Sequence, residues 1–298
     1  MWRPFLWLAV GAILAPILHR WADRIMKYSL YLLLLGLGAG IGANKAVVAA
    51  IPRLGLRALT ICLLASAVSI LLAWAWEKLF AKSVDHDEVN ESDDSVSDLS
   101  QEYYFILFVV MCLVGGIFGG YSLPVKPQII SWVIDLSLIA IYVSVGAGLV
   151  AGLEGLKSQI GKARYLWVPV LITVGSVAGG LLAAKILGTG LLVTGAVGGG
   201  MGYYSLTAAI LTQNGGAEPG FVAFLANFLR EVLTFFLTPL LARFSRLAPI
   251  ALGGATTMDT TLAVIKRSLG EEYAILGLLS GAVLTLVVPF LLVFILSL

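Results

Sequence analysis

The sequence predicts an all-α polytopic membrane protein with about eight transmembrane helices plus two re-entrant or broken helices. Hydrophobic residues make up 59% of the 298 residues, charged residues make up 12%, and the mean hydropathy is +0.98. Such a chain lacks the polar residues that would cover a soluble globule, so we expect lipid to solvate it. The net charge of +2 and the lack of a basic cluster argue against a nucleic-acid partner. Cys62 and Cys112 lie in apolar runs, which predicts buried thiols and no metal framework.

Apolar runs that approach the length of a membrane span, about 20 residues, define the expected helices. The first is followed by His19 and Arg20 and by no small-residue cleavage site, so we interpret it as a span and not as a signal peptide. The expected spans are Pro4–Leu18, Tyr28–Ala43, Ala58–Trp76, Tyr103–Gly119, Ile129–Gly152, Leu166–Leu187, Phe221–Ala242 and Tyr273–Leu298.

Two further apolar stretches, Thr189–Gln213 and Pro249–Lys266, contain clustered glycine and several Ser and Thr residues. Helices interrupted in this way leave backbone groups unpaired, and at membrane depth these must face protein or a water-filled cavity. We therefore expect both stretches to line one water-accessible site. The glycines expected where these helices break or approach each other are Gly199, Gly200, Gly253 and Gly254.

The distribution of Lys and Arg predicts the topology. If both interrupted stretches are re-entrant and the N-terminus is outside, twelve basic residues lie in the cytoplasm and six lie outside. If both stretches cross the membrane, the ratio falls to ten against eight, so the re-entrant arrangement is favoured. We expect helices 1–3 in residues 1–82, an acidic cytoplasmic loop in 83–101, and helices 4–8 with the broken-helix site in 102–298. Both termini are then outside, and one interrupted stretch enters from each side.

Glu231 and Asp259 are the candidate binding residues, because both are carboxylates within apolar sequence. Glu231 is the eleventh residue of the 21-residue run from Phe221 to Leu241. An ion at bilayer depth costs about 2.5–3.5 kcal/mol on insertion scales, so such residues usually face a cavity and carry function. Glu231 shares a helix face with Asn227 and with Thr234 and Thr238.

Arg230 points about 100° away from Glu231 around the helix, so its partner is expected elsewhere, with Asp259 as one candidate. A buried bridge that only fixes packing is the alternative role for Arg230. Aligning the two glycine pairs places Ser205 over Asp259 and Thr207 over Thr261, which leaves open whether the stretches are inverted repeats. Ser205, Thr257 and Thr261 are therefore expected to support the site.

Three stretches of the chain resemble the C-terminal half of the bacterial lysine exporter family, LysO. They are GGGMGYYSLTAAILTQ, FVAFLANFLREVLTFFLTPLLARFSR and ALGGATTMDTTLAVIKR, in that order. The resemblance implies an exporter of lysine in the inner membrane, with essential intramembrane acids that map onto Glu231 and Asp259. The chain departs from the family pattern at Val232 and Thr260 and in its acidic third loop, which puts the substrate range in doubt more than the fold.

The expected function is export of L-lysine from the cytoplasm in exchange for protons, with sodium left open as the coupling ion. Two carboxylates suit the ammonium groups of lysine, and glycine-rich half-helix starts suit its carboxylate. A sodium/proton or other organic-ion antiporter would use the same parts and is the alternative. An intramembrane aspartyl protease is disfavoured, because its YD and GxGD contexts are missing. We expect a non-enzyme without cofactor or metal, in contact with lipid, and leave a homo-oligomer open.

Overall fold

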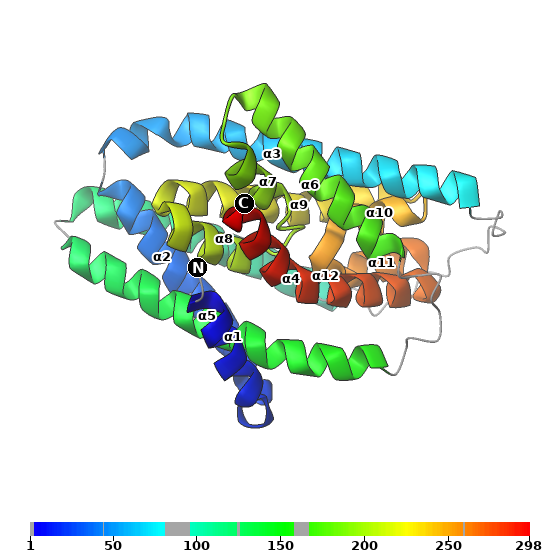
Figure 1. Ribbon diagram of the computed structural model, residues 1–298, viewed down its shortest axis with the longest axis horizontal. Coiled ribbons are helices and arrows are strands. Elements are labelled where there is room, and N and C mark those ends of the chain that lie inside the picture. Colours follow the sequence, from blue (N-terminus) through cyan, green and yellow to red (C-terminus); the bar gives the residue numbers. More distant parts are fainter. Residues whose placement is uncertain (1–2, 44, 81–95, 124–125, 158–166, 259) are drawn as a thin grey trace. The chain divides into compact units, whose positions relative to one another are not determined.

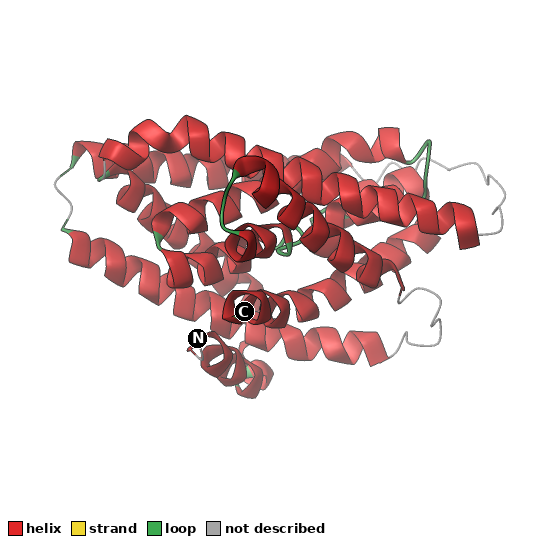
Figure 2. Cartoon of the chain, turned by 45° about the horizontal axis from the view of Figure 1, so that its top comes forward, coloured by secondary structure: helices red, strands yellow, loops and turns green. Residues whose placement is uncertain are grey.

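The computed structural model describes all residues except 1–2, 44, 81–95, 124–125, 158–166 and 259. The described part of the chain forms twelve α-helices and one short 3₁₀ helix, and Figure 2 shows no strand in it. Within the described residues, six helices are long and apolar enough to cross a membrane, which confirms the expected class of all-α membrane protein. Their spanning segments are Arg24–Gly42, Val48–Leu79, Pro127–Ala147, Trp167–Leu187, Ala217–Leu241 and Glu272–Ser297.

The first expected span is corrected by the structure, because two helices share its residues. Helix α1 (Arg3–Ile13) ends before Leu14, and α2 (Ala15–Gly42) begins after it, with Pro16 in its first turn. Proline lacks an N–H group and has a fixed φ, so it favours a helix start over a helix interior. The 11 residues of α1 rise only about 16 Å, which is less than the hydrocarbon thickness of about 30 Å.

The fourth expected span, Tyr103–Gly119, lies within α4 (Val96–Ser122). The last six residues of the expected loop 83–101 are therefore helical. Residues 83–95 of that acidic loop lie outside the described residues.

The chain folds as two compact units that are not continuous in sequence. Unit 1 comprises residues 1–56, 103–158 and 208–222, and unit 2 comprises residues 57–102, 159–207 and 223–298. Unit 1 therefore contains α1, α2, most of α4, and α5 (Pro127–Lys157), together with the first part of α3 (Lys45–Phe80).

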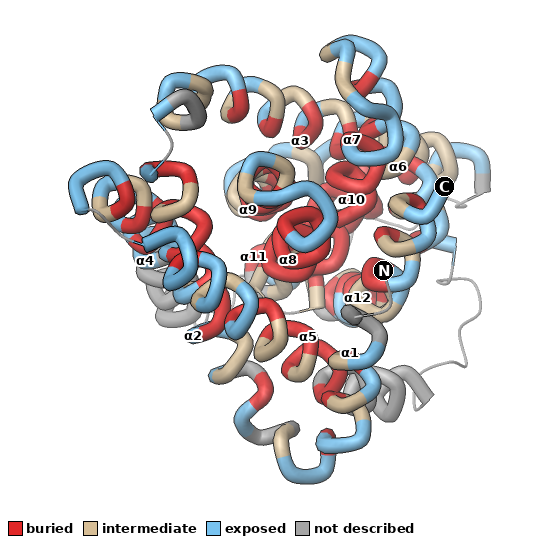
Figure 3. Tube along the Cα trace, turned by 60° about the vertical axis from the view of Figure 1, so that its left-hand side comes forward, coloured by how far each residue is buried: buried red, intermediate tan, exposed pale blue. Residues whose placement is uncertain are grey.

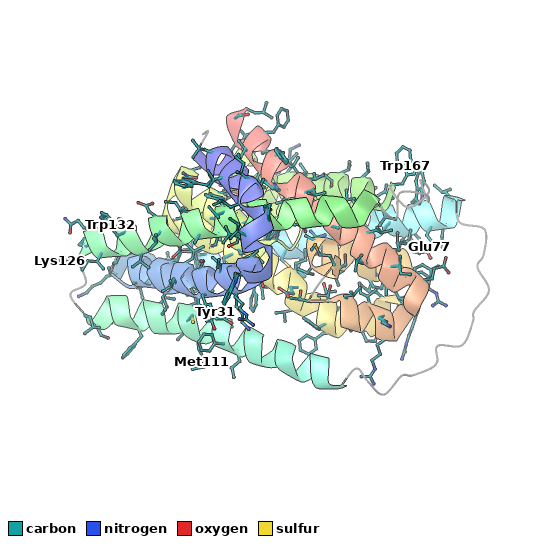
Figure 4. All side chains as sticks on the ribbon, turned by 90° about the horizontal axis from the view of Figure 1, so that it is seen from below. Tyr31, Glu77, Met111, Lys126, Trp132 and Trp167 are labelled. Carbon is teal, nitrogen blue, oxygen red and sulfur yellow. The ribbon has the colours of Figure 1, made fainter. Side chains whose placement is uncertain are left out.

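Glycines let the helices of unit 1 approach each other closely. A Cβ atom on Gly42 of α2 would lie 2.0 Å from the Ile117 carbonyl oxygen of α4. A Cβ atom on Gly146 of α5 would lie 2.1 Å from the Leu8 oxygen of α1. In Figure 4, Tyr31 of α2 points towards α4, where its ring meets Phe108 edge-on with centroids 4.6 Å apart. Small residues at helix contacts are typical of membrane helix packing.

Unit 2 contains both interrupted segments, as the glycine clusters predict. In the first segment, α7 (Leu191–Gly198) is followed by a turn and by α8 (Tyr204–Gly215), whose last residues belong to unit 1. In the second, α10 (Leu247–Gly253) passes into the 3₁₀ helix η3 (Gly254–Met258) and then α11 (Leu262–Leu269). All seven residues of α10 are buried, and Figure 3 shows this helix in the colour of burial. The surrounding helices are the second part of α3, α6 (Trp167–Leu187), α9 (Ala217–Leu241) and α12 (Glu271–Ser297).

The second interrupted segment returns to the end of unit 2 where it starts. The Glu77 carboxylate of α3 accepts hydrogen bonds from the N–H groups of Arg246 and Leu247 and from the Ser245 hydroxyl, directly before and at the start of α10. The Arg246 guanidinium lies over the ring of Tyr273 in the first turn of α12, 5.9 Å from its centroid. Since the residues that flank the segment lie together, its geometry is that of a re-entrant hairpin.

The first interrupted segment starts at the opposite end of these helices. Trp167, at the start of α6, stacks on Trp76 with centroids 5.4 Å apart, and Figure 4 shows Trp167 near Glu77. Helix α6 therefore begins beside Glu77, and α9 ends near it, because Ser245 comes four residues after the last residue of α9. Helix α7 folds back along α6 (Figure 1), with Gly198 against Ser176 and Gly180. The two segments thus enter from opposite ends, as the Lys and Arg distribution predicts.

Candidate functional site

The two helix breaks touch each other in unit 2. The Ala255 N–H donates a hydrogen bond of 2.8 Å to the Met201 carbonyl oxygen. Gly254 has φ of +62°, and a Cβ atom there would lie 2.3 Å from the same oxygen. A Cβ atom on Gly202 would lie 2.9 Å from the Gly253 oxygen. Only glycine combines this positive φ with such a close backbone approach, so the glycine clusters mark the crossing.

The four glycines predicted for the breaks are all at or beside the crossing. A Cβ atom on Gly200 would lie 2.4 Å from the Thr207 hydroxyl, and one on Gly253 would lie 2.5 Å from the Thr257 methyl. Gly199 is less constrained, since the atoms nearest to an added Cβ atom would lie 3.3 Å from it. The prediction of breaks that approach each other is therefore confirmed at Gly200, Gly253 and Gly254, with Gly199 in the adjoining turn.

Asn227 of α9 holds the first break. Its Oδ1 accepts a hydrogen bond of 2.8 Å from the Gly202 N–H, on the far side of the turn. Its Nδ2 donates to the carbonyl oxygens of Val197, near the end of α7, and Ala223, both at 3.0 Å. One buried amide thus satisfies backbone groups on both sides of an interruption that would otherwise leave them unpaired.

Arg230, almost one turn further along α9, holds the second break. Its Nε and Nη2 donate hydrogen bonds of 2.8 Å to the Leu252 and Ala251 carbonyl oxygens at the end of α10. Its Nη1 donates to the Ser176 hydroxyl of α6, also at 2.8 Å. The carbonyl end of a helix carries a partial negative charge, so a buried guanidinium is well placed there. These partners are neutral oxygens, and the predicted pairing of Arg230 with Asp259 stays a prediction because Asp259 lies outside the described residues.

Glu231 is fully buried, with 0% of its surface exposed. It lies on α9 between Asn227, which contacts the first break, and Thr234, whose methyl would lie 3.3 Å from a Cβ atom on Gly253 in the second. The shared face predicted for these side chains is confirmed by their common burial. The structure thus places the carboxylate-bearing residue of α9 at the level where both helices break.

Of the residues predicted to support the site, Thr257 and Thr261 lie buried at the second break and Ser205 lies beside the first. The Thr257 hydroxyl lies 2.8 Å from the Gly254 carbonyl oxygen and 2.7 Å from that of Gly277, so its one proton can be donated to either, and the contact with Gly277 ties η3 to α12. The hydroxyls of Thr261 and Thr256 lie 3.2 Å apart. Ser205 is buried in the first turn of α8. Among the described residues no group of three His, Cys, Asp or Glu side chains gathers as a metal site would require.

Two residues of this region were missed in the sequence. The Ser176 hydroxyl, which accepts a hydrogen bond from Arg230, also lies 2.9 Å from the Ser69 hydroxyl of α3. Ser176 lies among small apolar residues in the sequence, so no neighbouring polar residue indicated its role. Glu77 is the other, and its position near the end of an apolar run was the signal that could have identified it as a helix-end partner.

Two interrupted helices that enter from opposite ends and cross at their breaks define a class of helical membrane protein, the architecture that secondary transporters build around a midplane site. Comparison with known proteins gives the family. The chain belongs to the lysine exporter LysO family, whose family model matches residues 110–296.

Two relatives show how far this similarity extends. The chain is 35% identical over 160 residues to "Lysine exporter LysO" of Escherichia coli (strain K12), which covers 54% of each protein. It is 34% identical over 157 residues to a "Putative lysine exporter" of Haemophilus influenzae, which covers 53% of this chain and 80% of that protein. The match to the Escherichia coli protein thus spans about half of that protein's length.

Proposed function

We propose that this protein exports L-lysine from the cytoplasm in exchange for protons, with Glu231 and Asp259 as its substrate- and proton-binding residues. The observation that carries the proposal is the complete burial of Glu231 at the level of two crossed helix breaks. The names of the relatives, both lysine exporters, supply the substrate class. The protein is proposed to work as a multi-pass protein of the cytoplasmic (inner) membrane with both termini outside.

The chemistry of lysine fits a site of this kind. Its ammonium groups need anionic partners, which Glu231 and Asp259 provide, and its carboxylate needs N–H donors, which interrupted helices present at their half-helix starts. Glycines at Gly199, Gly200, Gly253 and Gly254 let the backbone come close to such a ligand. Asn227 and Arg230 keep the breaks in place around the carboxylates.

Proton exchange accounts for the charge balance. Moving one positive charge outwards against an inside-negative potential costs about 2.3 kcal/mol per 100 mV. One proton moving inwards cancels that charge and leaves the pH gradient as the driving force. Protonation of a buried carboxylate removes the negative charge that holds the ammonium group, so the same residue can release the cargo.

The test is transport of labelled lysine by the purified protein in liposomes. With an imposed pH gradient, lysine should move against the direction of proton flow, and liposomes without protein should show no such movement. A sodium gradient that drives lysine where the pH gradient does not would identify sodium as the coupling ion. Sodium–proton exchange without any lysine movement would overturn lysine export in favour of the cation antiporter.

A further inference from the structure

The polar face of α9 continues beyond Glu231 towards the end of the helix. Thr234 and Thr238 follow Glu231 at helix positions i+3 and i+7, which places all three on one face. All three are completely buried, whereas Phe236 is 63% and Leu240 49% exposed on the other side of the helix. The Thr-bearing face is therefore turned into unit 2, and the opposite face is exposed.

Thr238 is one of four buried Ser and Thr residues whose hydroxyl has no hydrogen-bond partner among the described residues, and the others are Ser66, Thr212 and Ser280. A Ser or Thr inside a helix usually donates to the carbonyl oxygen four residues earlier. Thr234 does so to Arg230, Thr173 to Pro169 and Ser69 to Ala65, at 2.8 Å each. The Thr238 hydroxyl is buried without a hydrogen bond from any described residue.

The backbone next to Thr238 also lacks one hydrogen-bond donor, the N–H group that a proline does not have. Pro239 lies inside α9 and has no N–H to give to the carbonyl oxygen of Phe235 four residues earlier. A hydroxyl and a carbonyl that both lack a helix partner thus lie within one turn, about 10 Å along the axis from Glu231. Polar groups left in this way destabilise the protein unless water or a ligand binds them.

The face leads to a carboxylate at the end of unit 2. Beyond α9, Ser245 donates to Glu77, which also accepts the N–H groups at the start of α10. Ammonium groups and water bind hydroxyls, carbonyls and carboxylates, so the series from Glu77 to Thr238 to Glu231 suits a cation that carries ammonium donors.

We propose that the face of α9 bearing Thr238 and Thr234 is a hydrated route along which the cationic cargo passes between Glu231 and the Glu77 end of unit 2. The identity of the cargo as lysine rests on the proposed function, whereas the hydration of the route does not. By the Lys and Arg distribution this end is the cytoplasmic one, so the route is the one by which cargo enters the site.

Cysteine accessibility tests the route directly. Thr238→Cys, in a background with Cys62 and Cys112 replaced, is treated in inverted membrane vesicles with a cationic methanethiosulfonate that does not cross membranes. Leu240→Cys, two residues away on the lipid side, and Ala226→Cys, in buried packing on the same helix, are the matched controls. Thr238→Cys should react at least about tenfold faster than both controls, because the reactive thiolate forms only where water reaches it.

A reaction rate equal to that of the controls would overturn the route. If Thr238→Cys does not give a monodisperse protein, Thr234→Cys, one turn nearer Glu231, takes its place with the same expectation. Fast reaction that lysine slows supports both the route and its cargo. Fast reaction that lysine does not slow supports the hydrated route but contradicts lysine as the cargo. Failure of the proposed function is thus distinguished from failure of the route.

Discussion

Asn227 and Arg230 lie three residues apart on α9, and each holds one of the two broken helices. The Asn227 amide binds the backbone of the first break, and the Arg230 guanidinium binds the carbonyl end of α10 at the second. Because both anchors belong to one helix, the spacing between the breaks is set by a single turn of α9. Glu231 directly follows Arg230, so the same turn places the buried carboxylate.

Loss of the Asn227 amide should destabilise the first break. In Asn227→Ala, the Gly202 N–H and the Val197 oxygen lose their partner, and a buried group without one costs about 1–3 kcal/mol. Thermal unfolding in detergent should show a clear decrease in midpoint. Asn214→Ala is the control, because Asn214 is exposed and donates to the Ile210 oxygen of its own helix. Equal decreases in the two variants would contradict an anchoring role for Asn227.

Arg230→Lys should also be destabilising, although it keeps the charge. One ammonium group cannot reproduce the planar fork that reaches Ala251, Leu252 and Ser176 at once. A hydrogen bond to a charged group contributes about 1.5–3 kcal/mol. The free energy of unfolding of Arg230→Lys should therefore fall by more than about 1.5 kcal/mol. Arg243→Lys, on the partly exposed turn after α9, should change stability by less than about 0.5 kcal/mol. If the two variants unfold alike, the guanidinium does not hold the second break.

Gly254 and Gly188 offer a matched comparison, because both have φ of +62°. Alanine is strained at both positions by the positive φ, and the ψ of −123° at Gly254 lies outside the left-handed helical region, which makes a side chain there more costly still. At Gly188 nothing lies within 4 Å of the added Cβ, whereas at Gly254 it would lie 2.3 Å from the Met201 oxygen. Gly254→Ala should therefore lose lysine transport and unfold at lower temperature than Gly188→Ala. Similar stability of the two would mean that the breaks do not need this close contact.

The sequence predicted the breaks and the buried face well, because both depend on local rules. Clustered glycine signals the positive φ and close approach that Gly254 shows, and the spacing of Asn227, Glu231 and Thr234 fixes a common helix face. The partners of Arg230 were not predictable. Ser176 is 54 residues away along the chain, and carbonyl oxygens carry no side-chain signal.

The helix boundaries and the contacts of Glu77 were also not predictable from local sequence. The turn between α1 and α2 divides an uninterrupted apolar run at Leu14, where only Pro16 hints at a new helix start. The Glu77 contacts bring together residues that are 168 to 170 positions apart, which no local pattern shows.

Topology can be tested with single cysteines in a background without Cys62 and Cys112. The Lys and Arg distribution predicts that residue 92 is cytoplasmic and that the connection after α4 is outside. In intact cells an impermeant maleimide should therefore label Ser122→Cys, an exposed position at the end of α4, and leave Ser92→Cys unlabelled. Labelling of Ser92→Cys in sealed cells would reverse the predicted sides.

The two carboxylates are predicted to be indispensable for transport and dispensable for assembly. Glu231→Gln and Asp259→Asn keep side-chain volume and remove the negative charge that we propose binds the ammonium groups and the proton. Asp135→Asn is the control, because Asp135 is exposed on α5 within unit 1. All three proteins should be inserted and monodisperse.

The most direct measurement is export of labelled lysine by these three variants in liposomes under one pH gradient, compared with the unsubstituted protein. We predict that Glu231→Gln and Asp259→Asn abolish transport and that Asp135→Asn retains it. Lysine export at the parental rate by Glu231→Gln would contradict the assignment of the buried carboxylate at the helix crossing as the binding residue.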